Sequence, residues 1–370
     1  MSLYAGDLQA ALPQVVREQM RNVWSDNWDY RRFGKEPKLS TRMCIVSGLR
    51  DVLVRMGIYR NRALVKLLGD APQLQWLYDR LSDDESRELM VQVLAFRVLG
   101  HRKVRLPLNT SEYWETLERL ERRAAAESAL GSGFQDWALP LHDLSDEGYS
   151  IRVYARAPGV YTQMLLQQYR CQLADHAIEV EPGDVVIDGG GCFGDTALYF
   201  AHKSGLGGQV YSFEFMPDNI RVFDRNLELN PGLAERIRIV PNPLWSSSGQ
   251  KLYVEGAGPG AHVTAVPRSE GAMQVETLTI DDLLRNNGLE RIDFIKMDIE
   301  GAELEALKGA ETVIRRFRPK LAISIYHRLP DFWEIPQWIE GLGLGYRFHL
   351  RHFTIHAEET VLFAEATSCP

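Results

Sequence analysis

The segment from Val185 to Gly205, VVIDGGGCFGDTALYFAHKSG, restricts the fold of this chain more than any other segment. It reads as a short apolar strand, a glycine-rich turn and the start of a helix. Glycine lets the backbone approach a ligand closely, and the start of a helix presents free N–H groups. The segment therefore predicts a strand–turn–helix unit that holds a nucleotide-like cofactor.

The glycines of this turn fit two motifs. Gly189, Gly191 and Gly194 match the G-x-G-x-x-G of nicotinamide-dependent enzymes. Asp188, Gly190 and Gly194 match the D-x-G-x-x-x-G that is often seen where S-adenosylmethionine binds. Because the two motifs overlap, the glycines alone leave both cofactors open.

The chain beyond this turn alternates between strand and helix patterns. Further strands are expected at residues 208–215, 236–242, 291–298 and 319–327. Such alternation predicts a mostly parallel sheet covered by helices on both faces. The tail contains GYRFHLRHF and TVLFAEA around a short polar stretch, which predicts a terminal antiparallel hairpin. Loops and short strands are expected in residues 243–280 at one edge of the sheet.

The N-terminal part has a different pattern. Residues 1–150 are expected to form a helical extension, acting as a lid or in self-association, and residues 151–370 the cofactor-binding domain. Ser82 and Glu85 suggest a capping box before a helix that ends at Gly100. A second helix is expected from Ser111 to about Gly131. The turn-rich stretch that follows places the boundary near residue 150.

Composition narrows the class of protein. Of 370 residues, 45% are hydrophobic and 25% charged, as in ordinary soluble proteins. The net charge of 42 − 50 = −8 argues against a nucleic-acid partner. Cys44, Cys171, Cys192 and Cys369 are scattered, so they indicate neither a zinc site nor a disulfide framework. With no signal-peptide pattern and no membrane-spanning run, we expect a cytoplasmic protein.

The surroundings of the turn favour S-adenosylmethionine. Asp188 would repel a dinucleotide pyrophosphate, whereas it suits a cofactor with an ammonium group and a cationic sulfur. Glu214 ends the next strand, where an acid can bind ribose hydroxyls in either cofactor class. The terminal hairpin also differs from the six parallel strands of most dehydrogenases.

Four blocks then carry a resemblance to a known family. They are GDVVIDGGGCFGDTALYFA, VYSFEFMPDNIRVFDRNLELNP, DFIKMDIEGAELEALKGA, and SIYHRLPDFWEIPQWI followed by YRFHLRHF and ETVLFA. In this order they resemble the FkbM-type S-adenosylmethionine-dependent methyltransferases over about residues 150–365. The resemblance implies an α/β fold with a Rossmann-like seven-stranded sheet. It also implies methyl transfer, typically to a hydroxyl of a sugar, glycolipid or secondary metabolite.

The resemblance assigns residues to the cofactor. The expected binding residues are Asp188, Gly190, Gly194, Glu214, Phe215 and Asn242. The first three would cradle the methionine end, Glu214 would hold the ribose, and the last two would contact the adenine. The family's loop commonly reads D-x-G-A-N-x-G, but Gly191 and Cys192 stand here in place of Ala and Asn.

The catalytic residues are expected at the carboxyl ends of the strands. A hydroxyl is a poor nucleophile, and a positioned base accelerates its reaction by about 10²–10⁴-fold. Asp298 and Glu300 follow the fourth strand and His327 follows the fifth, with His327 as the candidate base and His352 a weaker one. Asp298 and Glu300 could also bind magnesium. The fifth strand ends in Tyr326 and His327 rather than in a carboxylate, so no metal site is predicted.

Three functions remain open at this point. The favoured one is an O-methyltransferase with a small-molecule or glycan acceptor, possible also as a homo-oligomer. A nicotinamide-dependent oxidoreductase could use the same glycine turn. A non-catalytic partner protein could bind the cofactor, or nothing, and would tolerate the altered Gly191–Cys192 pair.

Overall fold

The computed structural model describes residues 7–37, 62–267 and 272–367, and it forms two compact units. The first unit comprises Met1–Trp114 with Phe348–Thr360. The second comprises Glu115–Arg347 with Val361–Pro370. The expected boundary near residue 150 stays a prediction, because compactness does not by itself establish an independently folding domain.

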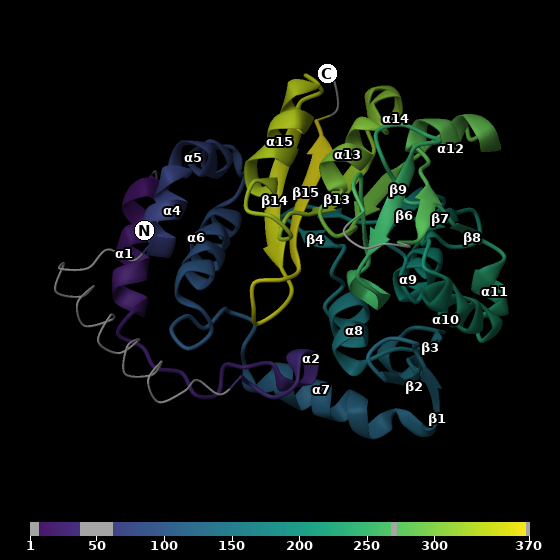
Figure 1. The fold of residues 1–370 in the computed structure, drawn as a ribbon, viewed down its shortest axis with the longest axis horizontal. Helices are drawn as coiled ribbons and strands as arrows, with labels where there is room; N and C mark the ends of the chain where they lie inside the picture. The colour runs from purple at the N-terminus through teal and green to yellow at the C-terminus, as the bar shows by residue number, and fades with distance from the viewer. Residues whose placement is uncertain (1–6, 38–61, 268–271, 368–370) are drawn as a thin grey trace. The chain divides into compact units, whose positions relative to one another are not determined.

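The first unit is built mainly from helices (Figure 1). They are α1 (Leu8–Gln19), α2 (Tyr30–Phe33), α4 (Arg62–Gly69), α5 (Ala71–Arg80), α6 (Asp84–Leu99) and the beginning of α7 (Ser111–Arg123). The predicted capping box of α6 is wrong, since Asp83 is the N-cap and accepts a hydrogen bond from the Ser86 N–H at 2.7 Å. The N–H of Ser82 donates instead to the carbonyl of Phe348. Gly100 ends the helix as predicted, with φ 77°.

A small antiparallel sheet replaces part of the expected second helix. α7 stops at Arg123, and β1 (Ala125–Gly131), β2 (Ala138–Asp143) and β3 (Arg152–Tyr154) follow. The expectation of a helix to Gly131 is therefore wrong. Leu139 of β2 is buried against Phe193 and Val222, which belong to the same unit, so tertiary packing overrides the local helix preference.

Most of the predicted seven-stranded sheet lies in the second unit. Its strands are β6 (Val185–Gly189), β7 (Gln209–Phe213), β8 (Ile237–Val240), β12 (Phe294–Met297), β13 (Lys320–Ser324), β14 (Tyr346–His352) and β15 (Thr360–Ala366). Residues 348–352 of β14 are counted with the first unit. Their order is β14-β15-β13-β12-β6-β7-β8. The central five strands are parallel, and β15 runs antiparallel to β13. This arrangement confirms the predicted α/β class, with the β14–β15 hairpin at one edge (Figure 1).

Helices and short strands complete the second unit. The helices are α8 (Ala157–Val160), α9 (Asp195–Ser204), α10 (Pro217–Glu228), α11 (Pro231–Ala234), α12 (Ile280–Asn287), α13 (Glu303–Lys308), α14 (Glu311–Phe317) and α15 (Asp331–Gly341). A three-stranded sheet of β9 (Lys251–Glu255), β10 (His262–Thr264) and β11 (Gln274–Glu276) confirms the short strands expected in 243–280. β4 (Cys171–Gln172) pairs with β5 (Ala177–Ile178).

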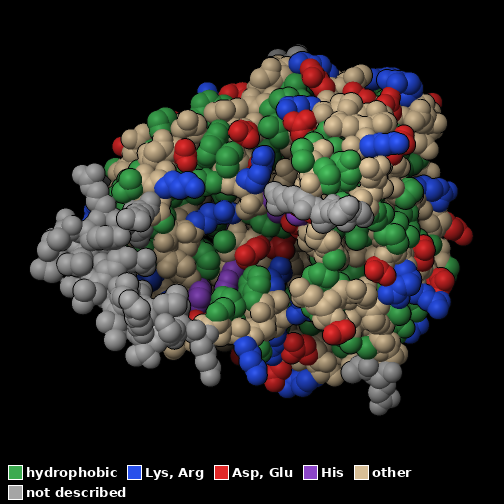
Figure 2. All heavy atoms as spheres, in the orientation of Figure 1, with side chains coloured by type: hydrophobic (Ala, Val, Ile, Leu, Met, Phe, Trp, Pro, Cys, Tyr) green, Lys and Arg blue, Asp and Glu red, His purple; other side chains and the backbone are tan. Residues whose placement is uncertain are grey.

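The surface charges, the helix lengths and the cysteine positions add three observations. Acidic and basic side chains are interspersed over the described residues on the face drawn in Figure 2. Within residues 7–37, 62–267 and 272–367, no helix is both long enough and apolar enough to span a bilayer. Cys171 begins β4 and Cys192 lies in the glycine turn, whereas Cys44 and Cys369 lie outside the described residues.

Candidate active site

The glycine turn follows β6, and its shape is set by contacts with three neighbouring elements. Gly190 and Gly194 have φ values of 84° and 82°, which favour glycine. A Cβ at Gly190 would lie 2.0 Å from the carbonyl oxygen of Asp298, and one at Gly194 would lie 2.1 Å from the Phe223 ring. The backbone N–H groups of Gly190 and Gly191 donate to the carbonyl of Phe213. The protein's own packing therefore requires glycine at these positions.

The departure at Gly191 and Cys192 has a structural basis. A Cβ at Gly191 would lie 2.1 Å from the hydroxyl oxygen of Ser212, so this backbone does not admit alanine. Cys192 adopts φ 45°, a left-handed conformation in which asparagine is more common than most residues. Ser212 thus occupies the space that an alanine methyl would need.

Asp188 supports the turn from inside the sheet. Its side chain is 0% exposed, and its Oδ1 lies 3.0 Å from the Nζ of Lys296, which is 1% exposed. Thr196 and Ser212 donate hydrogen bonds to Oδ2 at 2.9 and 2.7 Å. Lys296 also donates to the carbonyls of Gly189 and Gly190. Asp188 is therefore compensated by Lys296.

Lys296 is a buried residue beside the glycine turn that the sequence motifs did not indicate. Burial opposes its charge, but Asp188 and Asp298 together raise the pKa of its ammonium group. The signal in the sequence was a lysine within FIKM, an otherwise apolar strand. A charge at such a position needs a buried partner, and the parallel register places it beside Asp188 of β6.

The other expected cofactor residues lie at the ends of β7 and β8. Glu214 is buried, and its two carboxylate oxygens accept hydrogen bonds from the Met216 N–H and the Asn219 side chain. Burial raises the pKa of Glu214. Phe215 is half-buried, and Asn242 donates its side-chain amide to the carbonyl of Glu276. Roles for these residues in ribose and adenine binding stay predictions.

The three predicted catalytic residues lie together, with Asp298 and Glu300 beside the imidazole of His327. The Nε2 atom of His327 lies 3.4 Å from Oδ1 of Asp298 and 3.6 Å from Oε2 of Glu300. Its Nδ1 atom lies 3.1 Å from Oε1 of Glu303, the first residue of α13. Burial opposes the charged ring, but Glu303, Asp298 and Glu300 raise the pKa of His327 to about 10.

Glu303 is the second residue that sequence reasoning missed. Its side chain is 0% exposed, and Oε1 accepts a hydrogen bond from the Ile299 N–H at 2.8 Å. It follows Glu300 by three residues in MDIEGAE, a separation that brings side chains to one side of a turn. The left-handed backbone of Glu300 and Gly301, with φ 58° and 93°, makes the sharp turn between them.

Two tyrosines orient Asp298. The hydroxyl of Tyr326 donates to Oδ1 at 3.0 Å, and the hydroxyl of Tyr169 donates to Oδ2 at 3.3 Å. The N–H of Asp298 donates to the carbonyl of Gly189, which ties the end of β12 to the glycine turn. The cofactor turn and the carboxylate cluster are consequently one connected structure.

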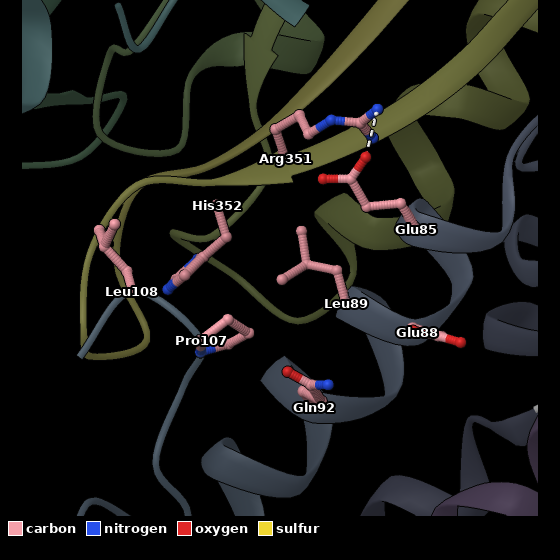
Figure 3. A pocket seen from close by; sticks show the side chains of 8 residues that line it. All are labelled: Glu85, Glu88, Leu89, Gln92, Pro107, Leu108, Arg351 and His352. Carbon is pink, nitrogen blue, oxygen red and sulfur yellow. Dashed lines mark ion pairs between the residues drawn. The ribbon is translucent and has the colours of Figure 1, made fainter. Parts of the chain in front are cut away.

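His352, the weaker candidate base, lies in the first unit. It lines a cavity of about 330 Å³ with α6 residues and the loop after α6 (Figure 3). Arg351 forms an ion pair with Glu85 at 3.0 Å there. Burial lowers the pKa of His352 to about 3, and its Nδ1 lies 2.9 Å from the hydroxyl of Thr360.

Comparison with known proteins identifies the family. The methyltransferase FkbM domain matches residues 188–348. Methyltransferase sdnD of Sordaria araneosa is 30% identical over 177 residues, which cover 39% of this chain and 68% of that protein. The chain belongs to the FkbM family of S-adenosylmethionine-dependent methyltransferases.

A further curated relative and a solved structure are also similar to this chain. Hexuronic acid methyltransferase AglP of Haloferax volcanii is 31% identical over 137 residues, covering 37% of this chain and 54% of AglP. The crystal structure of methyltransferase FkbM from Methylobacillus flagellatus shares the fold, with a TM-score of 0.52 and 20% identity. That match covers 91% of this chain and 72% of the other.

Three features were expected to hold S-adenosylmethionine: the glycine turn, Glu214 and Asp188. The first two are placed so that they fit this cofactor. The positive-φ glycine turn leads into α9, and the buried Glu214 lies on the adjacent strand, where a ribose diol can be bound. The third feature differs from expectation, because Lys296 already neutralises the carboxylate of Asp188. Asp188 supports the shape of the turn, and its expected role at the methionine end of the cofactor stays a prediction.

Proposed function

We propose that this protein transfers a methyl group from S-adenosylmethionine to a hydroxyl oxygen of a sugar, glycolipid or secondary metabolite. The observation that carries the proposal is the cluster of Asp298, Glu300, Glu303 and His327 beside the glycine turn. β13, β12 and β6 are neighbours in the sheet, so their carboxyl ends share the crevice where ligands bind in such folds.

The charge of the cluster suits this reaction. Three carboxylates around one imidazolium leave a net charge of about −2. Bound S-adenosylmethionine supplies a methyl group on a positively charged sulfur. A negative cluster can accept the proton that an acceptor hydroxyl must lose, and much of the remaining contribution is alignment. Glu214 holds the ribose in this arrangement.

The acceptor class is inferred from chemistry and from one relative. AglP is a hexuronic acid methyltransferase, so we infer a sugar as the acceptor class of this chain. The comparisons do not favour the nicotinamide-dependent alternative, because both curated relatives are methyltransferases.

Two experiments test the proposal. In the first, the purified full chain is titrated calorimetrically with S-adenosylhomocysteine, with NADH as the control. We expect binding of S-adenosylhomocysteine alone, and binding of NADH alone would overturn the assignment. In the second, transfer of a labelled methyl group is measured on a panel of uronic acids, hexoses and hydroxylated metabolites.

A variant then tests the cluster. His327→Gln removes the imidazole around which the carboxylates gather and should lower turnover, with S-adenosylhomocysteine affinity retained. The matched control is His176→Gln, because His176 pairs with Asp175 and Glu365 on the surface. Full turnover in His327→Gln would remove His327 from the reaction.

A further inference from the structure

The cluster has the arrangement of a metal site as well as that of an acid–base site. One ligand atom each from Asp298, Glu303 and His327 lies within 4.8 Å of the other two. Ligand atoms about 2.1 Å from a single ion lie about 3 to 4 Å apart, so the side chains are nearly in place. We propose that Asp298, Glu303 and His327 bind a divalent transition-metal cation of the Mn²⁺ type.

Unpaired buried atoms provide the second observation. The side chain of His327 is 8% exposed and that of Glu303 is 0% exposed. Neither ring nitrogen of His327 makes a hydrogen bond of acceptable geometry, and neither does Oε2 of Glu303. Buried polar atoms without partners are costly, and a cation between these side chains would give a partner to one ring nitrogen of His327 and to the Glu303 carboxylate.

The donor set indicates the kind of metal. Carboxylate oxygens alone suit Mg²⁺, Ca²⁺ or Mn²⁺, whereas an imidazole nitrogen suits first-row transition metals. Two carboxylates with one imidazole therefore favour Mn²⁺ over Mg²⁺. This set differs from the pair expected at first, because buried Glu303 contributes the second carboxylate in place of Glu300.

Neighbouring groups hold the ligands in position. Tyr326 and Tyr169 donate to the two oxygens of Asp298, and the Ile299 N–H donates to Oε1 of Glu303. Hydrogen bonds of this kind orient metal ligands and tune their affinity. Glu300 lies at the more open side, with its side chain 34% exposed.

The ion has a role in catalysis that rests on the proposed function. Three protein ligands leave coordination positions open, and an acceptor hydroxyl that binds there becomes more acidic. Its proton passes to the Glu300 carboxylate. The oxygen's electron pair forms the new bond to the methyl carbon, and the carbon–sulfur pair stays on sulfur as a neutral thioether.

Metal binding is tested without any acceptor. The full chain is treated with EDTA, dialysed and titrated with MnCl₂, while free Mn²⁺ is followed by electron paramagnetic resonance. We expect one bound ion per chain. Glu303→Gln should weaken binding by at least about tenfold, the loss that changes in a metal's outer shell alone produce. Glu305→Gln, whose carboxylate pairs with Lys308, is the matched control and should bind like wild type.

The outcomes separate the two proposals. Failure of the wild type to bind Mn²⁺, or unchanged binding in both Glu303→Gln and His327→Gln, overturns the metal site. Retained S-adenosylhomocysteine affinity shows that the variants are folded. Methyl transfer that is unaffected by EDTA also overturns the site while leaving the methyltransferase standing. If the wild type binds one Mn²⁺ per chain and Glu303→Gln weakens this binding, the metal site is supported, whether or not a hydroxyl acceptor reacts. Failure of every hydroxyl acceptor to react would count against the proposed function alone.

Discussion

Buried histidines in the two units have pKa values shifted in opposite directions. In the first unit, burial lowers the pKa of His352 to about 3 and that of His356 to about 4. In the second unit, neighbouring carboxylates outweigh burial and raise the pKa of His327 to about 10. The comparison teaches that burial alone does not set the charge of a side chain, because the charges beside it decide the sign.

The surroundings explain the difference. The ring of His356 lies among Trp28 and Phe33, with centroids 5.0 and 4.9 Å away, and its Nε2 accepts a hydrogen bond from the Asp29 N–H. His101 and Arg32 further disfavour a positive ring there, and Asp29 only partly opposes them. The second unit instead buries ions in compensated groups, of which Asp188 with Lys296 is the clearest.

The largest effect is expected from breaking that buried pair. Lys296→Met leaves the Asp188 carboxylate without its cation inside the sheet, which should lower the free energy of unfolding by about 3–5 kcal/mol. Urea unfolding followed by circular dichroism measures the loss. Asp188→Asn combined with Lys296→Met should recover part of the stability, and a double variant no better than Lys296→Met alone would contradict this account.

The next effect concerns pH and the first unit. Folded His356 takes up its proton near pH 4, whereas the unfolded state does so near 6.5, so stability falls as pH decreases below about 6.5. Between pH 7 and pH 5 the loss is about 2 kcal/mol for this residue. His352 should add a similar loss, since Arg97 and Arg32 also oppose its charge.

A substitution isolates the contribution of His356. His356→Gln keeps a side-chain acceptor for the Asp29 N–H but cannot be protonated. Its loss of stability from pH 7 to pH 5 should be smaller than that of wild type by about 2 kcal/mol. Hydrogen exchange of peptides from the hairpin tip reports the change locally. An unchanged pH slope would mean that His356 is not held neutral.

A moderate effect is expected in the glycine turn. Gly191→Ala places a methyl group against the Ser212 hydroxyl. It should lower the free energy of unfolding by about 1–3 kcal/mol. It should also weaken the binding of S-adenosylhomocysteine. Gly191→Ala with Ser212→Ala removes the clashing oxygen. The double variant should bind S-adenosylhomocysteine more tightly than Gly191→Ala, as measured by calorimetry. If it binds no more tightly, the Ser212 hydroxyl is not the cause of the loss.

The smallest effect is expected at Asp83, a carboxylate of the first unit that is compensated by charged neighbours. Asp83 caps α6 and contacts His349 and Arg351, which together with its hydrogen bonds outweigh burial and lower its pKa. Asp83→Asn keeps an oxygen for the cap but removes the charge, so we expect a loss of about 1 kcal/mol by thermal unfolding. Asp83→Ala should lose more, because the cap disappears as well.

Sequence patterns predicted most of the sheet domain and part of the site. Alternating strands and helices indicated the parallel sheet, because such connections allow few topologies. The strand ends also indicated Asp298, Glu300 and His327 as neighbours, since parallel strands bring their carboxyl ends to one edge. The small sheet after α7 was missed, because Leu139 gains its burial from residues distant in sequence.

The sequence by itself determined the glycine turn, the order of the strands along the chain and the acids that follow them. Each depends on local backbone preference or on the spacing of apolar residues, and residues close together in the sequence determine both. Only the tertiary structure decided which charges meet. The pairing of Lys296 with Asp188 follows from strand register, and Glu303 reaches His327 because a left-handed turn precedes α13. Pairing energies depend on distance and burial in space, and these are properties of the folded chain.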